Sequence, residues 1–381
     1  MTLENFWFIL IAVLFVGYFV LEGFDFGVGM LLPFLGRRDH PDGDKRRRLI
    51  INTIGPVWDG NEVWLITAGG ALFAAFGGWY ATMFSGFYIP LFLILLALIV
   101  RVCAIEWRGK ISDPKWRAWC DVGIGIGSWV PAILWGVAFA NILRGVPIEM
   151  DGPNHVYTGG FWNLLNPYAL LGGITTAVVF ATHGAIFIAL KTKGAMRDDA
   201  ARAAAGLSVL TLVIAGSFLL WTQLAYGKDW TWAITAVAAL GAVSMVAAAF
   251  ARREGVAFVA NCVAIAGTVA LLFGALFPNV MVSSTDEAFN LTIENTSSSH
   301  YTLVIMTWTA VIMTPVVIAY QAWTYWVFRK RLSVEDVPDA PAGLPMSDAV
   351  PASAAAPAAP AGSAAARDGG DGDSGSDTLG S

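Results

Sequence analysis

Long apolar runs separated by short polar loops dominate the pattern of this chain. A helix that crosses a bilayer needs about 20 apolar residues. Nine runs reach that length and predict membrane-spanning helices, at residues 6–35, 49–76, 80–102, 120–143, 161–190, 206–226, 230–250, 256–277 and 301–328. The sequence therefore predicts an all-α integral membrane protein with nine transmembrane helices.

The composition supports the same class. Of the 381 residues, 56% are hydrophobic and 13% are charged, whereas a soluble domain carries about 25% charged residues. No positively charged segment precedes the first run, so we expect that run to be a retained helix rather than a cleaved signal peptide. The absence of a Walker-type glycine motif and of a basic, aromatic-rich patch argues against nucleotide and nucleic-acid binding.

The lysines and arginines indicate the orientation of the chain. Twenty of them, Arg101 included, follow the first, third, fifth, seventh and ninth runs, and only Arg144 and Lys228 follow the others. Positive residues concentrate on the cytoplasmic side of membrane proteins. We therefore expect the N-terminus outside and the C-terminus in the cytoplasm.

The last part of the chain differs from the rest. Residues 333–381 consist mainly of Ala, Pro, Gly, Ser and Asp, and they carry eight acidic side chains against one arginine. Such a segment cannot bury enough apolar surface to fold. We expect residues 1–332 to form the membrane domain and residues 333–381 to form a disordered cytoplasmic tail that acts as a solvating extension.

Four carboxylates lie within or beside the first two runs. Glu22 and Asp25 belong to the first run, and Asp59 and Glu62 to the second. The members of each pair are three residues apart, which places them on one face of a helix. Asp25 and Asp59 each lie about 15–18 Å along their helices from the expected cytoplasmic charges.

These carboxylates have two possible roles. Carboxylates in hydrocarbon are costly and commonly mark proton or ion pathways, and burial favours their protonated form. The favoured interpretation is a proton relay through them. The alternative is a structural network in which they cap helices, pair with Arg101 or lysines, or hydrogen-bond to Trp and Asn.

Three further residues are candidates for the site. Arg101, at the end of the third run, is suited to neutralise a carboxylate or another anion, or else to extend to the membrane edge as an interfacial arginine. Trp58 is grouped with it as a candidate contact for a partner or an anion. Asp121 opens the fourth run and is a further proton-path candidate or an ordinary helix cap. The small residues at 123–128 would let helices approach closely.

The histidines and cysteines argue against a bound metal. His183 is the only histidine inside an apolar run, and a haem with two histidine ligands would need a second at matching depth. Methionine ligation stays formally possible, with Met245, Met306 and Met313 in helices. The three cysteines form no metal-ligand spacing. We expect this chain to ligate no haem or metal, and His183 to hydrogen-bond between helices.

Several strings resemble subunit II of the cytochrome bd quinol oxidases, in matching order over residues 1–332. They are Gly23-Phe24-Asp25-Phe26-Gly27-Val28-Gly29, Trp58-Asp59-Gly60-Asn61-Glu62-Val63-Trp64-Leu65, Phe84-Ser85-Gly86-Phe87-Tyr88, Trp119–Asp121 with Gly127-Ser128, Gly136-Val137-Ala138-Phe139-Ala140-Asn141, and Phe277-Pro278 with Ser283-Ser284-Thr285. The second string is the most specific.

The resemblance implies a heterodimeric terminal oxidase in the bacterial plasma membrane. In this family subunit I carries haems b558, b595 and d, oxidises quinol and reduces oxygen to water. Subunit II carries no haem, packs against subunit I as an obligate partner, and contributes to a cytoplasmic proton path. Its fold is two four-helix bundles plus one peripheral helix. Asp59 best matches the proton-path position, and Asp25, Glu22 and Glu62 are acidic residues of the same motifs.

Two other functions remain open from the sequence. A proton-coupled secondary transporter would also have buried carboxylates, but we find no clear inverted repeat of the kind such transporters show. An inert scaffold for a haem-bearing partner is compatible with the oxidase interpretation. The sequence does not distinguish a ubiquinol from a menaquinol donor. It also leaves open a structural quinone, small accessory single-helix subunits and the route of oxygen entry.

Overall fold

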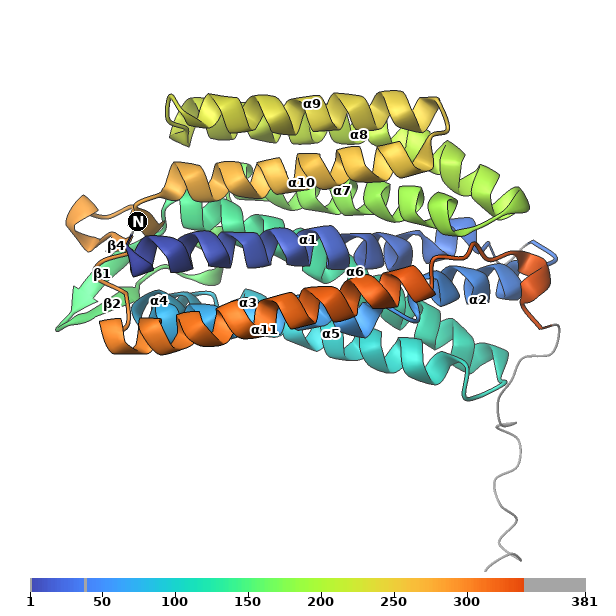
Figure 1. The fold of residues 1–381 in the computed structure, drawn as a ribbon, viewed down its shortest axis with the longest axis horizontal. Coiled ribbons are helices and arrows are strands. Elements are labelled where there is room, and N and C mark those ends of the chain that lie inside the picture. Colours follow the sequence, from blue (N-terminus) through green and yellow to red (C-terminus); the bar gives the residue numbers. More distant parts are fainter. Residues whose placement is uncertain (1, 38–39, 339–381) are drawn as a thin grey trace, which may run out of the picture. The chain divides into compact units, whose positions relative to one another are not determined.

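The computed structural model describes residues 2–37 and 40–338, and its described part is almost entirely helical (Figure 1). The eleven α-helices in this part are α1 (Leu3–Leu35), α2 (Gly43–Ile54), α3 (Trp58–Ala75), α4 (Gly77–Gly86), α5 (Tyr88–Arg108), α6 (Pro114–Arg144), α7 (Pro167–Lys191), α8 (Gly194–Tyr226), α9 (Thr231–Phe250), α10 (Glu254–Leu276) and α11 (His300–Val327). Two antiparallel strand pairs complete it, β1 (Ile148–Asp151) with β2 (Asn154–Tyr157) and β3 (Asn279–Met281) with β4 (Leu291–Thr292).

Eight of these helices are long and apolar enough to cross a membrane, namely α1, α5, α6, α7, α8, α9, α10 and α11. This confirms an all-helical membrane protein. The second predicted helix is not continuous, because the chain leaves helical structure at residues 55–57, between α2 and α3. Pro56 lies in this break, and proline cannot donate a backbone hydrogen bond. Because α3 begins with polar residues, it is not apolar enough to count among these eight helices.

Several predicted helix ends are also wrong. The third run is divided into the short α4 and the longer α5, with Phe87 between them. The fourth helix begins at Pro114 rather than at residue 120, and Asp113 caps it by accepting a hydrogen bond from the Lys115 backbone at 2.8 Å. The sixth begins at Gly194 rather than at residue 206. In the last two cases the helix extends beyond the apolar run into polar residues, which hydropathy does not register.

The first helix, α1, lies between two groups of helices. It packs on α3 and α6 on one side and on α7 and α10 on the other. In Figure 1, α8 and α9 lie at the top and α3, α5 and α11 at the bottom, with α1 between them. Closely packed pairs are α5 with α6, α7 with α8, and α9 with α10. The largest hydrophobic core cluster includes residues of both groups.

Glycine contacts allow α1 to approach α7. A Cβ atom added at Gly27 would lie 1.9 Å from the Phe180 carbonyl oxygen, and one added at Gly184 would lie 2.2 Å from the Gly27 carbonyl carbon. Neither position has room for a larger side chain, so backbone meets backbone here. This close contact holds the acidic end of α1 deep inside the protein.

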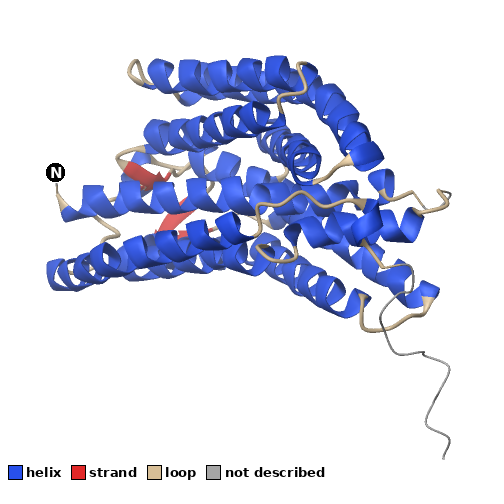
Figure 2. Ribbon diagram, turned by 45° about the vertical axis from the view of Figure 1, so that its right-hand side comes forward, coloured by secondary structure: helices blue, strands red, loops and turns tan. Residues whose placement is uncertain are grey.

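Helix α11 is the most exposed of the long helices, and Leu303 is its only buried residue. Beyond it, Leu332 pairs with Thr192 in a short bridge, and a 3₁₀ turn (Val334–Asp336) leads to the buried Val337. Figure 2 shows this connection as a loop that runs alongside the helices. The first residues of the predicted tail are therefore described, and residues 339–381 lie outside the described part.

Candidate functional site

Arg101 is fully buried and is the centre of a charged cluster. Its guanidinium forms an ion pair with Glu22 of α1, and neither side chain is exposed. The same Nη1 atom lies 3.2 Å from Oε1 of Glu62 on α3, and the guanidinium lies 4.9 Å from the centre of the Phe26 ring. Because α5 continues for two further turns to Arg108, Arg101 is not an interfacial arginine at the membrane edge. The alternative of an extended, solvated side chain is therefore wrong.

Asp25 is also fully buried, and it is held by Asn61 of α3. The Asn61 amide Nδ2 donates to Asp25 Oδ2 at 2.6 Å. On its other side, Asn61 Oδ1 accepts from the Tyr325 hydroxyl at 2.8 Å and from Gln321 Nε2 at 3.2 Å. Residues of α1, α3 and α11 thus meet at this point. The second oxygen of Asp25 has no hydrogen-bond partner among the described residues.

The charges of this cluster do not balance. Three carboxyl groups, those of Glu22, Asp25 and Glu62, surround one guanidinium, and two of the three are wholly shielded from solvent. An uncompensated buried charge costs several kcal/mol, so such groups are neutralised by protons or by partners. The arrangement is chemically suited to hold exchangeable protons.

Asp59 is placed differently from the other three. It is exposed on the outer face of α3, and it makes no hydrogen bond or ion pair within the described part of the chain. Glu62, one turn later, faces inward to Arg101 with 20% of its side chain exposed. Trp58 is 9% exposed and belongs to a core cluster of this chain, so most of its surface is covered internally.

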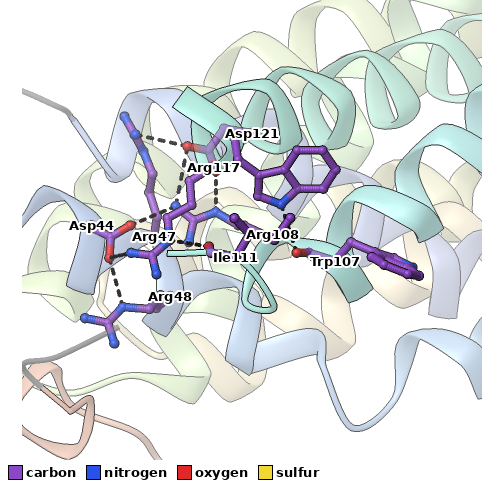
Figure 3. A network of polar contacts seen from close by, with 9 residues as sticks. Asp44, Arg47, Arg48, Trp107, Arg108, Ile111, Arg117 and Asp121 are labelled. Atoms are coloured by element: carbon purple, nitrogen blue, oxygen red, sulfur yellow. Dashed lines mark hydrogen bonds and ion pairs between the residues drawn. The ribbon is translucent and has the colours of Figure 1, made fainter. Parts of the chain in front are cut away.

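Asp121 belongs to a separate network that joins the start of α2, the end of α5 and the start of α6 (Figure 3). Arg108 Nε donates to it at 2.6 Å and Arg47 Nη1 at 3.0 Å. Arg108 also pairs with Asp44 at 3.1 Å. Asp44 forms further ion pairs with Arg48 and Arg117. Asp121 is thus neither a helix cap nor a member of the Arg101 cluster. Its geometry is that of an ion pair that ties three helix ends together.

His183, on α7, faces α1 and α10. Its Nε2 is 3.0 Å from the Val20 carbonyl oxygen, and its ring stacks on Phe258 at 4.6 Å. The expected hydrogen bond between helices is therefore confirmed. No group of three or more His, Cys, Asp or Glu residues is placed to hold a metal ion within residues 2–37 and 40–338.

A cavity of about 60 Å³ lies among α1, α6 and α7–α10. Asn261 and Thr175 line it. The amide nitrogen and oxygen of Asn261 and the hydroxyl of Thr175 have no hydrogen-bond partner among the described residues. Both residues are buried. Unpaired polar groups of this kind cost about 1–3 kcal/mol each unless a bound molecule satisfies them.

Sequence reasoning missed three residues of the main site, Asn61, Gln321 and Tyr325. Asn61 stands inside the acidic motif and is as deeply buried as Asp25. Gln321 and Tyr325 are polar residues four apart in an otherwise apolar helix, which places them on one face. That spacing was the available signal for a contact with another polar group.

The comparisons with known proteins identify the family. A sequence model described as "Cytochrome bd terminal oxidase subunit II" matches residues 3–328. The chain is 43% identical over 339 residues to cytochrome bd ubiquinol oxidase subunit 2 of Bacillus subtilis, with 87% of this chain and 97% of that protein covered. It is 37% identical over 373 residues to cytochrome bd-I ubiquinol oxidase subunit 2 of Escherichia coli, with 88% and 97% covered.

A solved structure shows the same fold. A chain of the bd oxidase from Geobacillus thermodenitrificans aligns with a TM-score of 0.69 and 16% identity, over 86% of this chain and 99% of that one. The chain belongs to the cytochrome bd terminal oxidase subunit II family, as its motifs predicted. This membership displaces the alternative of a proton-coupled secondary transporter.

Proposed function

We propose that this subunit II works with a haem-bearing subunit I in which quinol is oxidised and oxygen is reduced to water, and that its buried carboxylates carry protons to the reaction from the cytoplasm. The observation that carries the proposal is the excess of buried carboxyl groups around Arg101. Oxygen reduction consumes protons, and a protein that performs it inside a membrane needs groups that bind and release them there.

The route follows the order of the carboxyl groups. Asp59 is on the surface of α3, and Glu62 lies one turn further along the same helix, within ion-pair distance of Arg101. Arg101 connects Glu62 to Glu22, and Asn61 connects α3 to Asp25. We place Asp121 outside this path, because two arginines already hold it in the cytoplasmic network.

The exposed face of α3 is where we expect subunit I to bind. Asp59, Val63, Ile66, Gly70 and Phe73 are spaced by three or four residues and form one exposed stripe. A groove of about 410 Å³ between α3 and α11 adjoins it, lined in part by Val63. Lipid cannot compensate the charge of Asp59, so a protein partner is the occupant that fits. Without it the subunit should assemble poorly, which makes the partner obligate.

The finer architecture follows from the packing of the helices. We propose that α3, although less apolar than the others, is the ninth membrane crossing. The two four-helix bundles are then α1, α3, α5 and α6, and α7 to α10, with α11 as the peripheral helix. From the lysine and arginine pattern we further propose that the protein lies in the bacterial plasma membrane with its N-terminus outside.

If this subunit binds a structural quinone, we propose that the quinone head group occupies the cavity at Asn261 and Thr175. The amide and the hydroxyl are donors that suit carbonyl oxygens, and aromatic side chains, Trp135 and Phe218 among them, supply apolar walls. The test is the quinone content of the purified complex with Asn261→Leu, which should fall. Unchanged content would exclude this place.

The experiment that tests the proton role uses matched Asp→Asn variants. This change keeps size and hydrogen bonding but removes the titrating group. With Asp25→Asn or Asp59→Asn, quinol oxidase turnover should fall at least tenfold while the haem spectrum of the complex persists. The control is Asp198→Asn, on the surface in a half-exposed pair with Arg252.

A structural role predicts a different result. Haem content and subunit yield would then fall together with turnover. The proton proposal is excluded if both complexes assemble normally and turn over at the wild-type rate across the neutral pH range.

A further inference from the structure

Two polar side chains of the exposed helix α11 reach the buried site. Tyr325 donates its hydroxyl proton to Asn61 Oδ1 at 2.8 Å, and Gln321 Nε2 donates to the same oxygen at 3.2 Å. Four residues separate them, so they lie on one face of the helix. Apart from Leu303 near its start, α11 buries no residue. These contacts are therefore an unusual polar attachment for a peripheral helix.

The orientation of Gln321 is fixed by Trp64. The indole nitrogen of Trp64 donates to Gln321 Oε1 at 2.7 Å. An indole N–H donates and never accepts, so the amide oxygen of Gln321 must face Trp64. Its NH₂ group is then directed to Asn61.

The orientation of Asn61 follows from the same rule. Its Oδ1 already accepts from Gln321 and Tyr325, so its NH₂ group faces the other way. There Nδ2 donates to Asp25 Oδ2 at 2.6 Å and lies 3.4 Å from the Leu21 carbonyl oxygen. If the Asn61 amide were reversed, its NH₂ group would face the donors of Gln321 and Tyr325, and its oxygen would face the carboxylate of Asp25.

We propose that Trp64, Gln321 and Tyr325 are positioning residues that fix Asn61 as a hydrogen-bond donor to Asp25, so that the peripheral helix sets the protonation of the buried site. A donor stabilises the ionised carboxylate, and an acceptor in its place would stabilise the protonated acid. This inference rests on the proposed proton role of Asp25. It adds that the proton affinity of the site is adjusted from α11, which itself carries no charge toward Asp25.

The other charged or titratable groups around Asp25 are known from the structure. Arg101 on α5 and Glu62 on α3 act on it electrostatically, and Glu22 lies one turn away on α1. Tyr325 is the titratable group contributed by α11. Substitution of Gln321 or Trp64 leaves all of these groups in place, and Tyr325→Phe removes only a hydroxyl that bonds to Asn61 and not to Asp25. A shift in these variants therefore reports on the orientation of Asn61.

The test is an infrared pH titration of the carboxyl group of Asp25 in the purified complex, with the signal assigned by its loss in Asp25→Asn. In the double variant Gln321→Leu/Tyr325→Phe, Asn61 Oδ1 loses both donors and the amide is free to turn. The titration midpoint should move to higher pH by about one unit, the effect of one hydrogen bond. Trp64→Phe, which does not touch Asp25, should give a smaller shift in the same direction.

The control is Tyr320→Phe, which removes a phenol hydroxyl from the exposed face of the same helix and should leave the midpoint unchanged. An unchanged midpoint in the double variant with normal haem content overturns the inference. If the double variant does not assemble, Trp64→Phe and Tyr325→Phe alone decide, and wild-type midpoints in both overturn it.

These results are distinct from those for the proton role. A shifted midpoint together with full turnover in Asp25→Asn would support the orienting chain and refute the proton role of Asp25. Lost turnover in Asp25→Asn with unshifted midpoints in the variants would do the opposite.

Discussion

Arg101 and Glu22 form an ion pair in which neither side chain is exposed. Its members come from α5 and α1, so the ion pair links these two helices through their side chains. Removing one member of a buried pair leaves the other uncompensated and typically costs about 3–5 kcal/mol. Because Glu62 lies within ion-pair distance of the same guanidinium, Arg101 is the shared partner of two carboxyl groups of the cluster.

Arg101→Met should therefore destabilise the subunit by at least that amount and strongly reduce assembly. The measurements are subunit yield, haem content and thermal unfolding of the detergent-solubilised complex. The matched control is Arg144→Met at the exposed C-terminal end of α6, which should be close to wild type. Normal assembly of Arg101→Met would show that the three carboxyl groups are neutral without it.

Asp121→Asn should lower the stability of the complex without lowering its activity. The change weakens the charged hydrogen bonds from Arg108 and from Arg47; such bonds are worth about 1.5–3 kcal/mol each. We expect a lower unfolding temperature of the complex but an unchanged turnover per haem. A loss of turnover at normal stability would instead indicate that Asp121 takes part in the proton path.

The orientation can be checked by cysteine labelling with an impermeant reagent, in a background without Cys103, Cys120 and Cys262. Asn154→Cys, in the β1–β2 hairpin, should react from outside intact cells. Lys330→Cys, in the basic segment after α11, should react only after the membrane is opened. Labelling of Lys330→Cys from outside would overturn the topology and the cytoplasmic origin of the protons.

Hydropathy was sufficient to predict the class of the fold and most of its helices. It failed where polarity and helix formation diverge. In the second run Pro56 breaks the helix although apolar residues continue, and before the fourth run the helix begins at Pro114 although its first turns are polar. A count of apolar residues measures solubility in lipid, whereas the helix ends depend on caps and on backbone hydrogen bonds.

The motifs predicted the chemistry of the site but not its partners. Glu22, Asp25, Glu62 and Arg101 were all singled out, and the structure brings them together. Asp59 was grouped with them by its spacing from Glu62, yet three residues rotate a side chain about 60° around the helix, enough to place one outside and one inside. The contacts of Asn61 with α11 join residues about 260 positions apart, which no local pattern reveals.

The last prediction concerns the packing that places Arg101. A Cβ atom at Gly127 of α6 would lie 2.4 Å from the Arg101 Cβ and 2.6 Å from the Ala97 carbonyl oxygen, closer than real contacts allow. Gly127→Ala should therefore push α5 away from α6, move Arg101 from Glu22, and lower both assembly and turnover. Gly125→Ala is the matched control, because a Cβ there meets nothing within 4 Å.

Alanine also favours helix over glycine by up to about 1 kcal/mol, so Gly125→Ala should be neutral or slightly stabilising. The two variants add the same methyl group to the same helix and differ only in what it meets. Thermal unfolding and haem content of the two complexes are the measurements. Equal stability of both complexes would mean that α5 and α6 can move apart without a loss of stability. The position of Arg101 would then not depend on the small residue at 127.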